Sequence, residues 1–188
     1  AQFDAALNMT LKTIEFAKER DAIPFAVFKP TGFGRLALYE KVGAKAYLTE
    51  NEQKEWNRVI ERFDIACKTA FEKDVLLLID AEESWMQDAA DAIVADMMRK
   101  YNKQKAIVFN TLQMYRWDRL DYLKSLHDQA KSEGFYIGMK LVRGAYMEKE
   151  NDRAAERGQK SPICESKEAT DINYDAAVSY MVDHLDIM

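Results

Sequence analysis

The sequence has 188 residues, 48% of them hydrophobic and 31% charged, so it encodes a globular chain about one domain long and not a disordered one. Its formal net charge of −5, without a basic stripe that alternates with aromatic residues, argues against binding to nucleic acid. No apolar run is long enough to span a bilayer, and Asp4, Lys12 and Glu15 fall within an amphipathic pattern that is unlike a signal peptide.

The first elements predicted along the chain are a helix, a strand and two further helical stretches. Apolar residues from Phe3 to Ile14 recur at helical spacing, and Phe25–Phe28 is a short apolar run typical of a strand. A short helical stretch follows at 36–42. Thr49 and Glu52 then form a capping box that starts a helix, whose apolar side consists of Val59, Ile60, Phe63, Cys67, Ala70 and Phe71.

Three continuous apolar runs come next, at Val75–Ile79, Ala106–Phe109 and Ile137–Val142. They start at residues 75, 106 and 137, an interval of 31 residues both times. Continuous runs without alternation predict strands buried on both faces, as in a parallel sheet. A helix is predicted after each strand, and Ser84 with Gln87 has the spacing of a capping box at the start of the first. These helices cover residues 85–101, 115–126 and 174–185.

Alternating strands and helices with right-handed crossovers indicate an α/β fold with a parallel sheet, either open and doubly wound or part of a barrel. Four parallel strands alone would leave two unpaired sheet edges. We therefore expect residues 1–188 to be a segment of one parallel (βα)8 TIM-type barrel, truncated at both ends. The chain would supply about half of that barrel, as four strands with their helices.

Cysteines and histidines predict no metal or redox site. Cys67 and Cys164 are far apart in the sequence, and Cys67 falls on the apolar side of a helical pattern, which predicts a buried thiol in a reducing compartment. His127 and His184 stand in charged helical surroundings without a ligand partner four residues on. We expect neither histidine to bind metal or to belong to a catalytic triad.

Polar residues follow every predicted strand. Because ligands of parallel α/β proteins bind at the carboxyl ends of the strands, we expect these side chains to converge on one pocket. They are Lys29, Asp80, Asn110, Lys140 and Arg143. Plainer explanations also exist: a solvated turn residue for Lys29, a helix N-terminus for Asp80, a helix cap for Asn110, and an ion pair of Arg143 with Glu148 or Glu150.

Three blocks at these strand ends, Leu78–Glu83, Val108–Gln113 and Lys140–Tyr146, resemble the proline dehydrogenase family in type and order. The resemblance covers roughly residues 20–185, and its Arg-Gly-Ala-Tyr form is more like the stand-alone and mitochondrial-type enzymes than the large bifunctional bacterial ones. It implies a (βα)8 barrel that binds FAD and oxidises L-proline to Δ1-pyrroline-5-carboxylate, the first step of proline catabolism. The electron acceptor that it implies is a quinone.

The resemblance also implies roles for individual residues. Asp80 and Lys140 would be catalytic, while Lys29 would pair with the proline carboxylate and Tyr146 would pack on the substrate ring. Asn110 would take the place of a glutamine that hydrogen-bonds the flavin, and Lys140 that of an arginine beside flavin N5. The full set expected to contact FAD is Ala81, Asn110, Lys140, Val142, Arg143, Gly144 and Ala145.

One part of the family pattern is missing from this sequence. The paired arginines that clamp the carboxylate lie on the family's last barrel helix, and no Arg-Arg-x-x-Glu segment occurs here. We therefore expect the segment alone neither to bind FAD tightly nor to oxidise proline, and the full-length protein to carry the activity. Quinone use implies peripheral membrane contact in the full-length protein. The location would be the bacterial cytoplasm or the inner face of the bacterial membrane, or alternatively the matrix side of the mitochondrial inner membrane.

Three alternatives stay open at this stage. Hydroxyproline oxidation on the same scaffold is a close variant that these residues do not separate from proline oxidation. A barrel enzyme could instead bind Mg²⁺ through Asp80 and Glu82, although the lysines at the other strand ends argue against it. The third alternative is a non-catalytic domain whose barrel serves only as an interaction surface.

Overall fold

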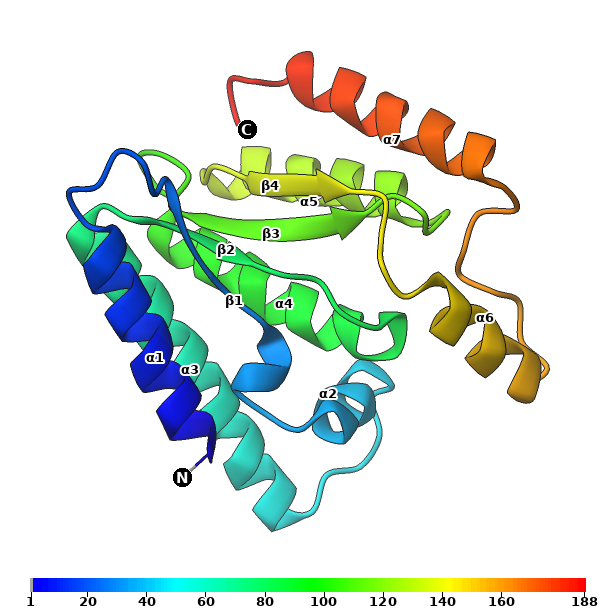
Figure 1. The fold of residues 1–188 in the computed structure, drawn as a ribbon, viewed down its shortest axis with the longest axis horizontal. Coiled ribbons are helices and arrows are strands. Elements are labelled where there is room, and N and C mark those ends of the chain that lie inside the picture. The colour runs from blue at the N-terminus through cyan, green and yellow to red at the C-terminus, as the bar shows by residue number, and fades with distance from the viewer. Residues whose placement is uncertain (1) are drawn as a thin grey trace.

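A computed structural model describes residues 2–188, which form one parallel sheet with helices packed against it (Figure 1). The strands are β1 (Phe25–Phe28), β2 (Leu76–Ile79), β3 (Val108–Gln113) and β4 (Gly138–Val142). They lie in the order β1-β2-β3-β4, each parallel to its neighbour. Every connection therefore leads to the adjacent strand in the same sense, which is the topology of a barrel segment and confirms the predicted α/β alternation.

Helices occupy the connections between strands and the two ends of the chain. The first helix, α1 (Gln2–Ala17), packs on α3 (Glu50–Lys73), and α2 (Leu36–Gly43) packs on α4 (Ser84–Tyr101). The last two helices follow β4, with α6 lying beyond the carboxyl ends of β3 and β4 in Figure 1. The other bounds are those of a 3-10 turn η1 (Pro30–Gly32), α5 (Arg119–Glu133), α6 (Met147–Glu156) and α7 (Lys167–Val182).

The sheet has one face buried under helices and one more open face. Ala26, Leu77 and Val108 are paired across the strands, are completely buried and belong to the apolar core. Successive residues in a strand point to opposite faces. Their neighbours Val27 and Phe109 therefore lie on the other face, where Val27 is 45% exposed. The position of a residue along its strand therefore decides whether its side chain faces the helices or the open face of the sheet.

Two local predictions at helix starts have opposite outcomes. Thr49 caps α3 in the predicted capping box: its hydroxyl accepts from the Glu52 N–H, and the Glu52 carboxylate accepts from the Thr49 N–H. The box predicted for Ser84 and Gln87 is wrong, because Glu83 is the cap residue of α4 and Ser84 is already in the helix. The Gln87 side chain instead accepts from the Glu82 N–H.

The remaining sequence predictions concern metal, thiol and membrane features. Cys67 is completely buried, as predicted. His127 is buried and shares a hydrogen bond with the Tyr180 hydroxyl. Residues 2–188 contain no group of three or more His, Cys, Asp or Glu side chains arranged to hold a metal ion. In the same range, no helix combines the length and the apolar composition needed to cross a membrane.

Candidate active site

A cavity of about 310 Å³ lies at the carboxyl ends of the strands. Residues from the ends of all four strands line it, so side chains far apart in the sequence meet there. The lining residues are Lys29, Asp80, Ala81, Thr111, Gln113, Lys140, Val142, Arg143, Gly144, Ala145 and Tyr146. Of the residues expected at a common pocket, Asn110 alone is missing from this lining.

Asp80 lies at the centre of the charged part of the pocket. Its backbone N–H donates to the Phe28 carbonyl, which continues the ladder between β1 and β2 and sets the carboxylate at the sheet edge. One carboxylate oxygen accepts from Lys140 Nζ at 2.5 Å, and the other from Lys29 Nζ at 3.3 Å. Partial burial alone would raise the pKa of Asp80, but Lys140 and Lys29 outweigh it and hold the pKa below its ordinary value.

Lys29 and Tyr146 form the adjoining wall. Burial alone would lower the pKa of Lys29, but Asp80 and the neighbouring Tyr146 and Glu82 raise it above its ordinary value, so the ammonium stays charged. The Lys29 side chain is 52% exposed, which leaves donor capacity for an anionic ligand. Tyr146 ends the turn before α6 as its cap residue, and burial raises the pKa of its phenol. The pocket therefore offers a cation beside an aromatic ring.

At Gly144 the backbone lines the pocket and passes close to the Tyr115 ring. This residue has φ +133°, in a region that L side chains avoid, and an added Cβ would lie 2.5 Å from the Tyr115 ring. The side chain of Arg143, the residue before it, is half exposed, and its Nε donates to Asp171 at 2.6 Å. The alternative explanation of Arg143 as an ion-pair partner of Glu148 or Glu150 is therefore wrong. Glycine is required here both for its backbone angle and for the contact with the Tyr115 ring.

Asn110 is not part of the pocket, because β3 does not end there. The strand continues to Gln113, and Asn110 pairs with Met139 on the face that points to the helices. Its side chain is completely buried and donates to Asp91 Oδ1 on α4 at 2.9 Å. Asn110 therefore joins the sheet to α4 and does not line the pocket in which we expected it.

Gln113 is the residue that sequence reasoning missed. It lies three residues further along β3, on the same face as Thr111 and Lys140, and is only 2% exposed. Its Nε2 donates to the Glu82 carbonyl, while its Oε1 has no hydrogen-bond partner within residues 2–188. A buried acceptor without a partner points to a ligand donor. The signal available in the sequence was the polar-apolar alternation Thr111-Leu112-Gln113, which extends the strand past Asn110.

Glu82 supports the pocket from behind. Its buried carboxylate accepts from the Thr31 N–H at 2.9 Å and from the Thr31 hydroxyl at 2.8 Å, which ties the turn after Lys29 to the segment after β2. Glu82 is thus engaged with Thr31, and Asp80 with two lysines. Both carboxylates expected for a Mg²⁺ site already have these partners, and the lysine cations would repel a metal ion.

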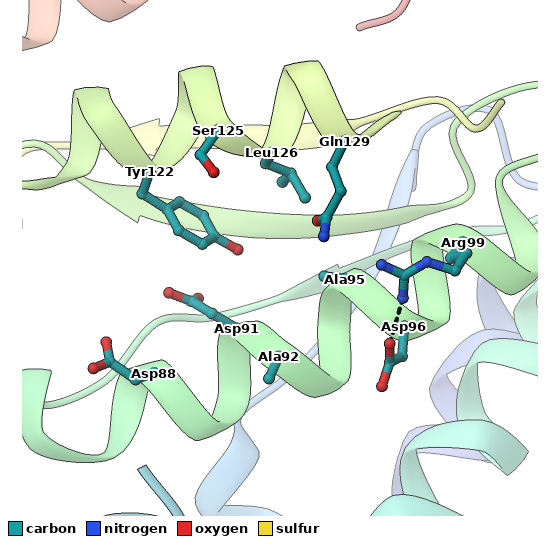
Figure 2. Close-up of a pocket in the computed structure, with 10 residues that line it drawn as sticks. All are labelled: Asp88, Asp91, Ala92, Ala95, Asp96, Arg99, Tyr122, Ser125, Leu126 and Gln129. Atoms are coloured by element: carbon teal, nitrogen blue, oxygen red, sulfur yellow. Dashed lines mark hydrogen bonds and ion pairs between the residues drawn. The ribbon is translucent and has the colours of Figure 1, made fainter. Parts of the chain in front are cut away.

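A second cavity adjoins this pocket, and a third shares no lining residue with it. The second, of about 450 Å³, shares Arg143 and Gly144 with the pocket and reaches Ser166 and Lys167 at the N-terminus of α7. The third, of about 410 Å³, lies between α4 and α5, where Tyr122 faces α4 (Figure 2). No residue predicted for the active site lines this third cavity. The second extends the strand-end pocket and gives it room for a ligand larger than a small amino acid.

The residues of the two connected cavities fit a flavin cofactor. Gln113 Oε1 is a free acceptor for a ring N–H, Lys140 is a cation, and Gly144 permits close approach of the backbone. The N-terminus of α7 with Lys167 suits the phosphate groups of a dinucleotide.

The family model described as "Proline dehydrogenase" matches residues 1–188. The chain belongs to the proline dehydrogenase family. It is 37% identical over 186 residues to the carbapenem antibiotics biosynthesis protein CarD of Pectobacterium carotovorum, covering 98% of this chain and 48% of that protein. It is 39% identical over 137 residues to human mitochondrial proline dehydrogenase 1, covering 73% of this chain and 23% of that protein. The chain thus spans less than half the length of either relative.

Solved structures of proline utilization A show the same architecture. Proline utilization A (PutA) from Bdellovibrio bacteriovorus aligns with a TM-score of 0.83 at 18% identity, over 99% of this chain and 20% of that chain. PutA from Bradyrhizobium japonicum aligns with a TM-score of 0.79 at 20% identity, over 97% of this chain and 18% of that chain. These likenesses confirm the fold prediction: the four strands are part of a (βα)8 barrel.

Proposed function

We propose that the protein containing this segment oxidises L-proline to Δ1-pyrroline-5-carboxylate with FAD, as the first step of proline catabolism. The observation that carries the proposal is the meeting of Lys29, Asp80, Lys140 and Tyr146 in one strand-end pocket of a proline dehydrogenase-family chain. A small zwitterion with an apolar ring needs a cation for its carboxylate and a flat surface for its ring, and this wall supplies both.

Each residue has a distinct role in this proposal. Lys29, with its ammonium half exposed, binds the substrate carboxylate. Tyr146 packs on the pyrrolidine ring. Asp80 holds both lysines through its two carboxylate oxygens and thereby fixes their spacing. The substrate amine reacts in its neutral form, and the cations of Lys29 and Lys140 disfavour the charged ammonium.

FAD would be held by Gln113, Lys140, Ala81 and the backbone of 142–145. When bound, FAD would supply the redox chemistry: it would take one hydride, which carries both electrons, from the carbon next to the proline nitrogen. The nitrogen lone pair would form the C=N bond of the product, and the nitrogen would lose its proton. The residues of this chain hold the substrate in place and exclude water, and the effectiveness of such positioning depends on sub-ångström geometry. Lys140, ion-paired to Asp80, places positive charge beside the site.

Electron acceptor and location follow from the family. We propose that a quinone takes the electrons, through peripheral contact of the full-length protein with a membrane. Mitochondrial relatives from human and Drosophila melanogaster, at 39% and 40% identity, support a mitochondrial location, for which we propose the matrix side of the inner membrane. The bacterial relative from Pectobacterium supports the alternative proposal, which is the bacterial cytoplasm or the inner face of the bacterial membrane.

Hydroxyproline is the second candidate substrate, because a hydroxyproline dehydrogenase of Xenopus laevis is 34% identical over 143 residues, covering 76% of this chain and 31% of that protein. The lining residues of the pocket do not separate the two substrates. The ratio of kcat/KM for L-proline and 4-hydroxyproline in the full-length protein decides between them.

The test uses the purified full-length protein with FAD and a redox dye or soluble quinone. L-Proline should reduce the bound flavin, seen as bleaching of its visible absorbance. Lys29→Met should raise the KM for L-proline roughly a hundredfold, because the substrate carboxylate loses its cation. Lys12→Met, at an exposed position of α1, is the matched control and should leave KM unchanged. Flavin that L-proline does not bleach would refute the proposal.

A further inference from the structure

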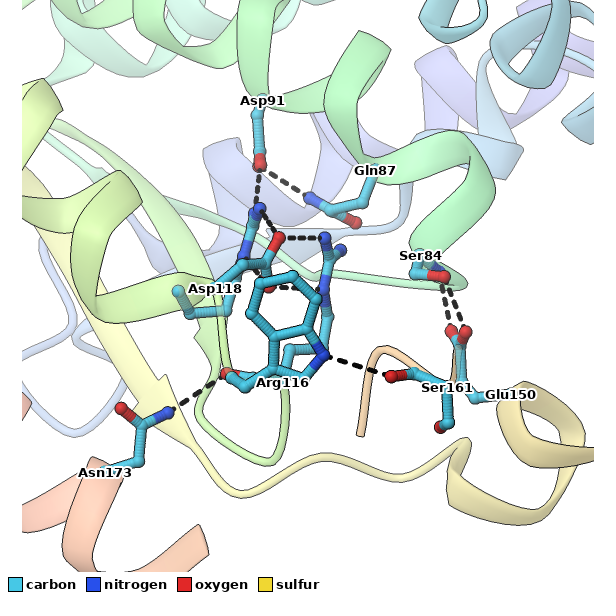
Figure 3. A network of polar contacts seen from close by, with 10 residues as sticks. Ser84, Gln87, Asp91, Arg116, Asp118, Glu150, Ser161 and Asn173 are labelled. Carbon is cyan, nitrogen blue, oxygen red and sulfur yellow. Dashed lines mark hydrogen bonds and ion pairs between the residues drawn. The ribbon is translucent and has the colours of Figure 1, made fainter. Parts of the chain in front are cut away.

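Glu150 on α6 is a buried carboxylate that the proposed chemistry does not use. It is 2% exposed, although α6 is otherwise a highly charged helix. Its Oε1 accepts from the Ser84 backbone N–H at 2.6 Å, and its Oε2 accepts from the Ser84 hydroxyl at 2.5 Å (Figure 3). A carboxylate at this point satisfies a free N–H of α4 and complements the positive end of the helix dipole. Glu150 therefore caps α4 from another helix.

The two elements joined by this contact both carry site residues. Ser84 begins α4, four positions after Asp80. On the other side, the Glu150 backbone N–H donates to the carbonyl of Tyr146 at 2.9 Å, so the same residue closes the first turn of α6. A second, more exposed ion pair between Lys149 and Glu83 runs beside it. Glu150 is thus four residues along the chain from Tyr146, and it is hydrogen-bonded to Ser84, which is four residues from Asp80.

Hydrogen bonds connect these two loops only indirectly, through β3: Gln113 Nε2 donates to the Glu82 carbonyl, and the Tyr115 N–H donates to the Arg143 carbonyl. The strands β2 and β4 are not neighbours, because β3 lies between them. The direct link inside the pocket is the ion pair of Asp80 with Lys140, whose flexible side chain allows many separations. A buried carboxylate with two short hydrogen bonds to one residue holds a much narrower range of positions.

We propose that Glu150 is a positioning residue of the active site. It holds the Gly144–Tyr146 segment against the Asp80–Ser84 segment and so sets Tyr146 at the correct distance from substrate. The inference rests on the proposed function, because it assigns Tyr146 to the substrate ring.

The experiment uses the full-length protein with bound flavin. Glu150→Ala should raise the KM for L-proline by on the order of tenfold to a hundredfold, while the flavin content changes little. Glu150→Gln keeps an acceptor for the Ser84 N–H and should restore KM to within about threefold of the parent. Glu148→Ala removes an exposed carboxylate from the same turn and should have no effect, which controls for helix charge.

Hydrogen exchange of the backbone amides of residues 144–150 measures, without any catalysis, how firmly Glu150 holds this segment in place. Glu150→Ala should speed this exchange, and Glu148→Ala should not. Ser84→Ala removes one of the two hydrogen bonds and should give a smaller effect in the same direction. Adding it to Glu150→Ala should cause no further loss, because the two residues act as a unit. If Glu150→Ala does not fold, the single variant Ser84→Ala tests the same contact.

The outcomes separate the two proposals. If Glu150→Ala leaves both KM and amide exchange as in the parent, the positioning role is overturned while proline oxidation stands. If the parent protein does not oxidise proline, the proposed function fails, and the exchange data still decide whether Glu150 holds the two segments together. A KM defect that Glu150→Gln does not relieve would also overturn the role assigned to the hydrogen bonds.

Discussion

Lys140 and Asp80 form an ion pair across an intervening strand, with 2.5 Å between Nζ of the lysine and Oδ1 of the aspartate. Lys140 belongs to β4 and Asp80 follows β2, so the contact passes over the end of β3 beside Thr111, the register partner of Lys140. A second lysine, Lys29 after β1, reaches the other carboxylate oxygen of Asp80. A single carboxylate therefore connects the ends of three strands and defines the charged floor of the pocket.

Replacement of Asp80 tests this connection. Asp80→Asn leaves two lysine cations facing each other without a carboxylate, so we expect kcat/KM for L-proline to fall roughly a hundredfold in the full-length protein, with the fold retained. Steady-state kinetics together with circular dichroism measure both effects. Asp128→Asn, at an exposed position of α5, is the control. Unchanged kinetics in Asp80→Asn would remove this residue from the site.

Gln113 and Asn110 should respond to substitution in opposite ways. Gln113→Ala removes the free buried acceptor, so FAD should bind roughly tenfold more weakly. Asn110→Ala deprives the buried Asp91 carboxylate of a donor, so the protein should lose about 1–3 kcal/mol of stability with little change in FAD affinity once folded. Flavin titration measures the FAD affinity of both variants, and urea unfolding measures their stability. Weaker FAD binding in Asn110→Ala, with unchanged binding in Gln113→Ala, would place Asn110 and not Gln113 at the flavin.

Gly144 should tolerate no side chain. An added Cβ would meet the Tyr115 ring at 2.5 Å and would also sit at φ +133°, so Gly144→Ala should destabilise the loop by about 1–3 kcal/mol and abolish stoichiometric flavin binding. Gly158→Ala is a matched control, since Gly158 also has positive φ but nothing lies within 4 Å of an added Cβ. A Gly144→Ala protein that binds one flavin per chain would contradict the requirement for glycine at this position.

Asp118 should contribute a pH-dependent part of the stability. Burial alone would raise its pKa, but hydrogen bonds from Arg119 and Arg116 lower the pKa of Asp118 to about 2 (Figure 3). Because the folded-state pKa lies below the unfolded value near 4, this stabilisation is complete above about pH 4 and is lost as the pH falls toward 2.

The corresponding measurement compares Asp118→Asn with the parent in urea. At pH 7 the variant should be less stable by about 2 kcal/mol, and the difference should shrink as the pH drops below 4. Asp152→Asn, an exposed substitution on α6, should show no such trend. A stability difference that stays constant between pH 7 and pH 3 would mean that the arginine contacts do not shift the titration of Asp118.

Local sequence patterns determined most of the fold and part of the site. Apolar runs indicated four strands in their order, and the residues just after β1 and β2, Lys29 and Asp80, do meet in the pocket. These predictions succeed because the carboxyl ends of parallel strands must lie at one edge of a sheet. The motif around Gly144 and Tyr146 was likewise readable, and both residues line the same cavity.

Tertiary structure alone decided which side each polar residue faces and with what it pairs. Asn110 follows the apolar run at the start of β3 and Gln113 ends the strand three residues later, but only the pairing of β3 with β4 shows that Asn110 faces the helices and Gln113 faces the pocket. The burial of Glu150 against Ser84 depends on two helices that no local pattern brings together. Side chains alternate between the two faces of a strand, so an error of one position in the predicted strand end places a residue on the wrong face of the sheet. Contacts between residues distant in sequence form only when the strands and helices pack together in the tertiary structure.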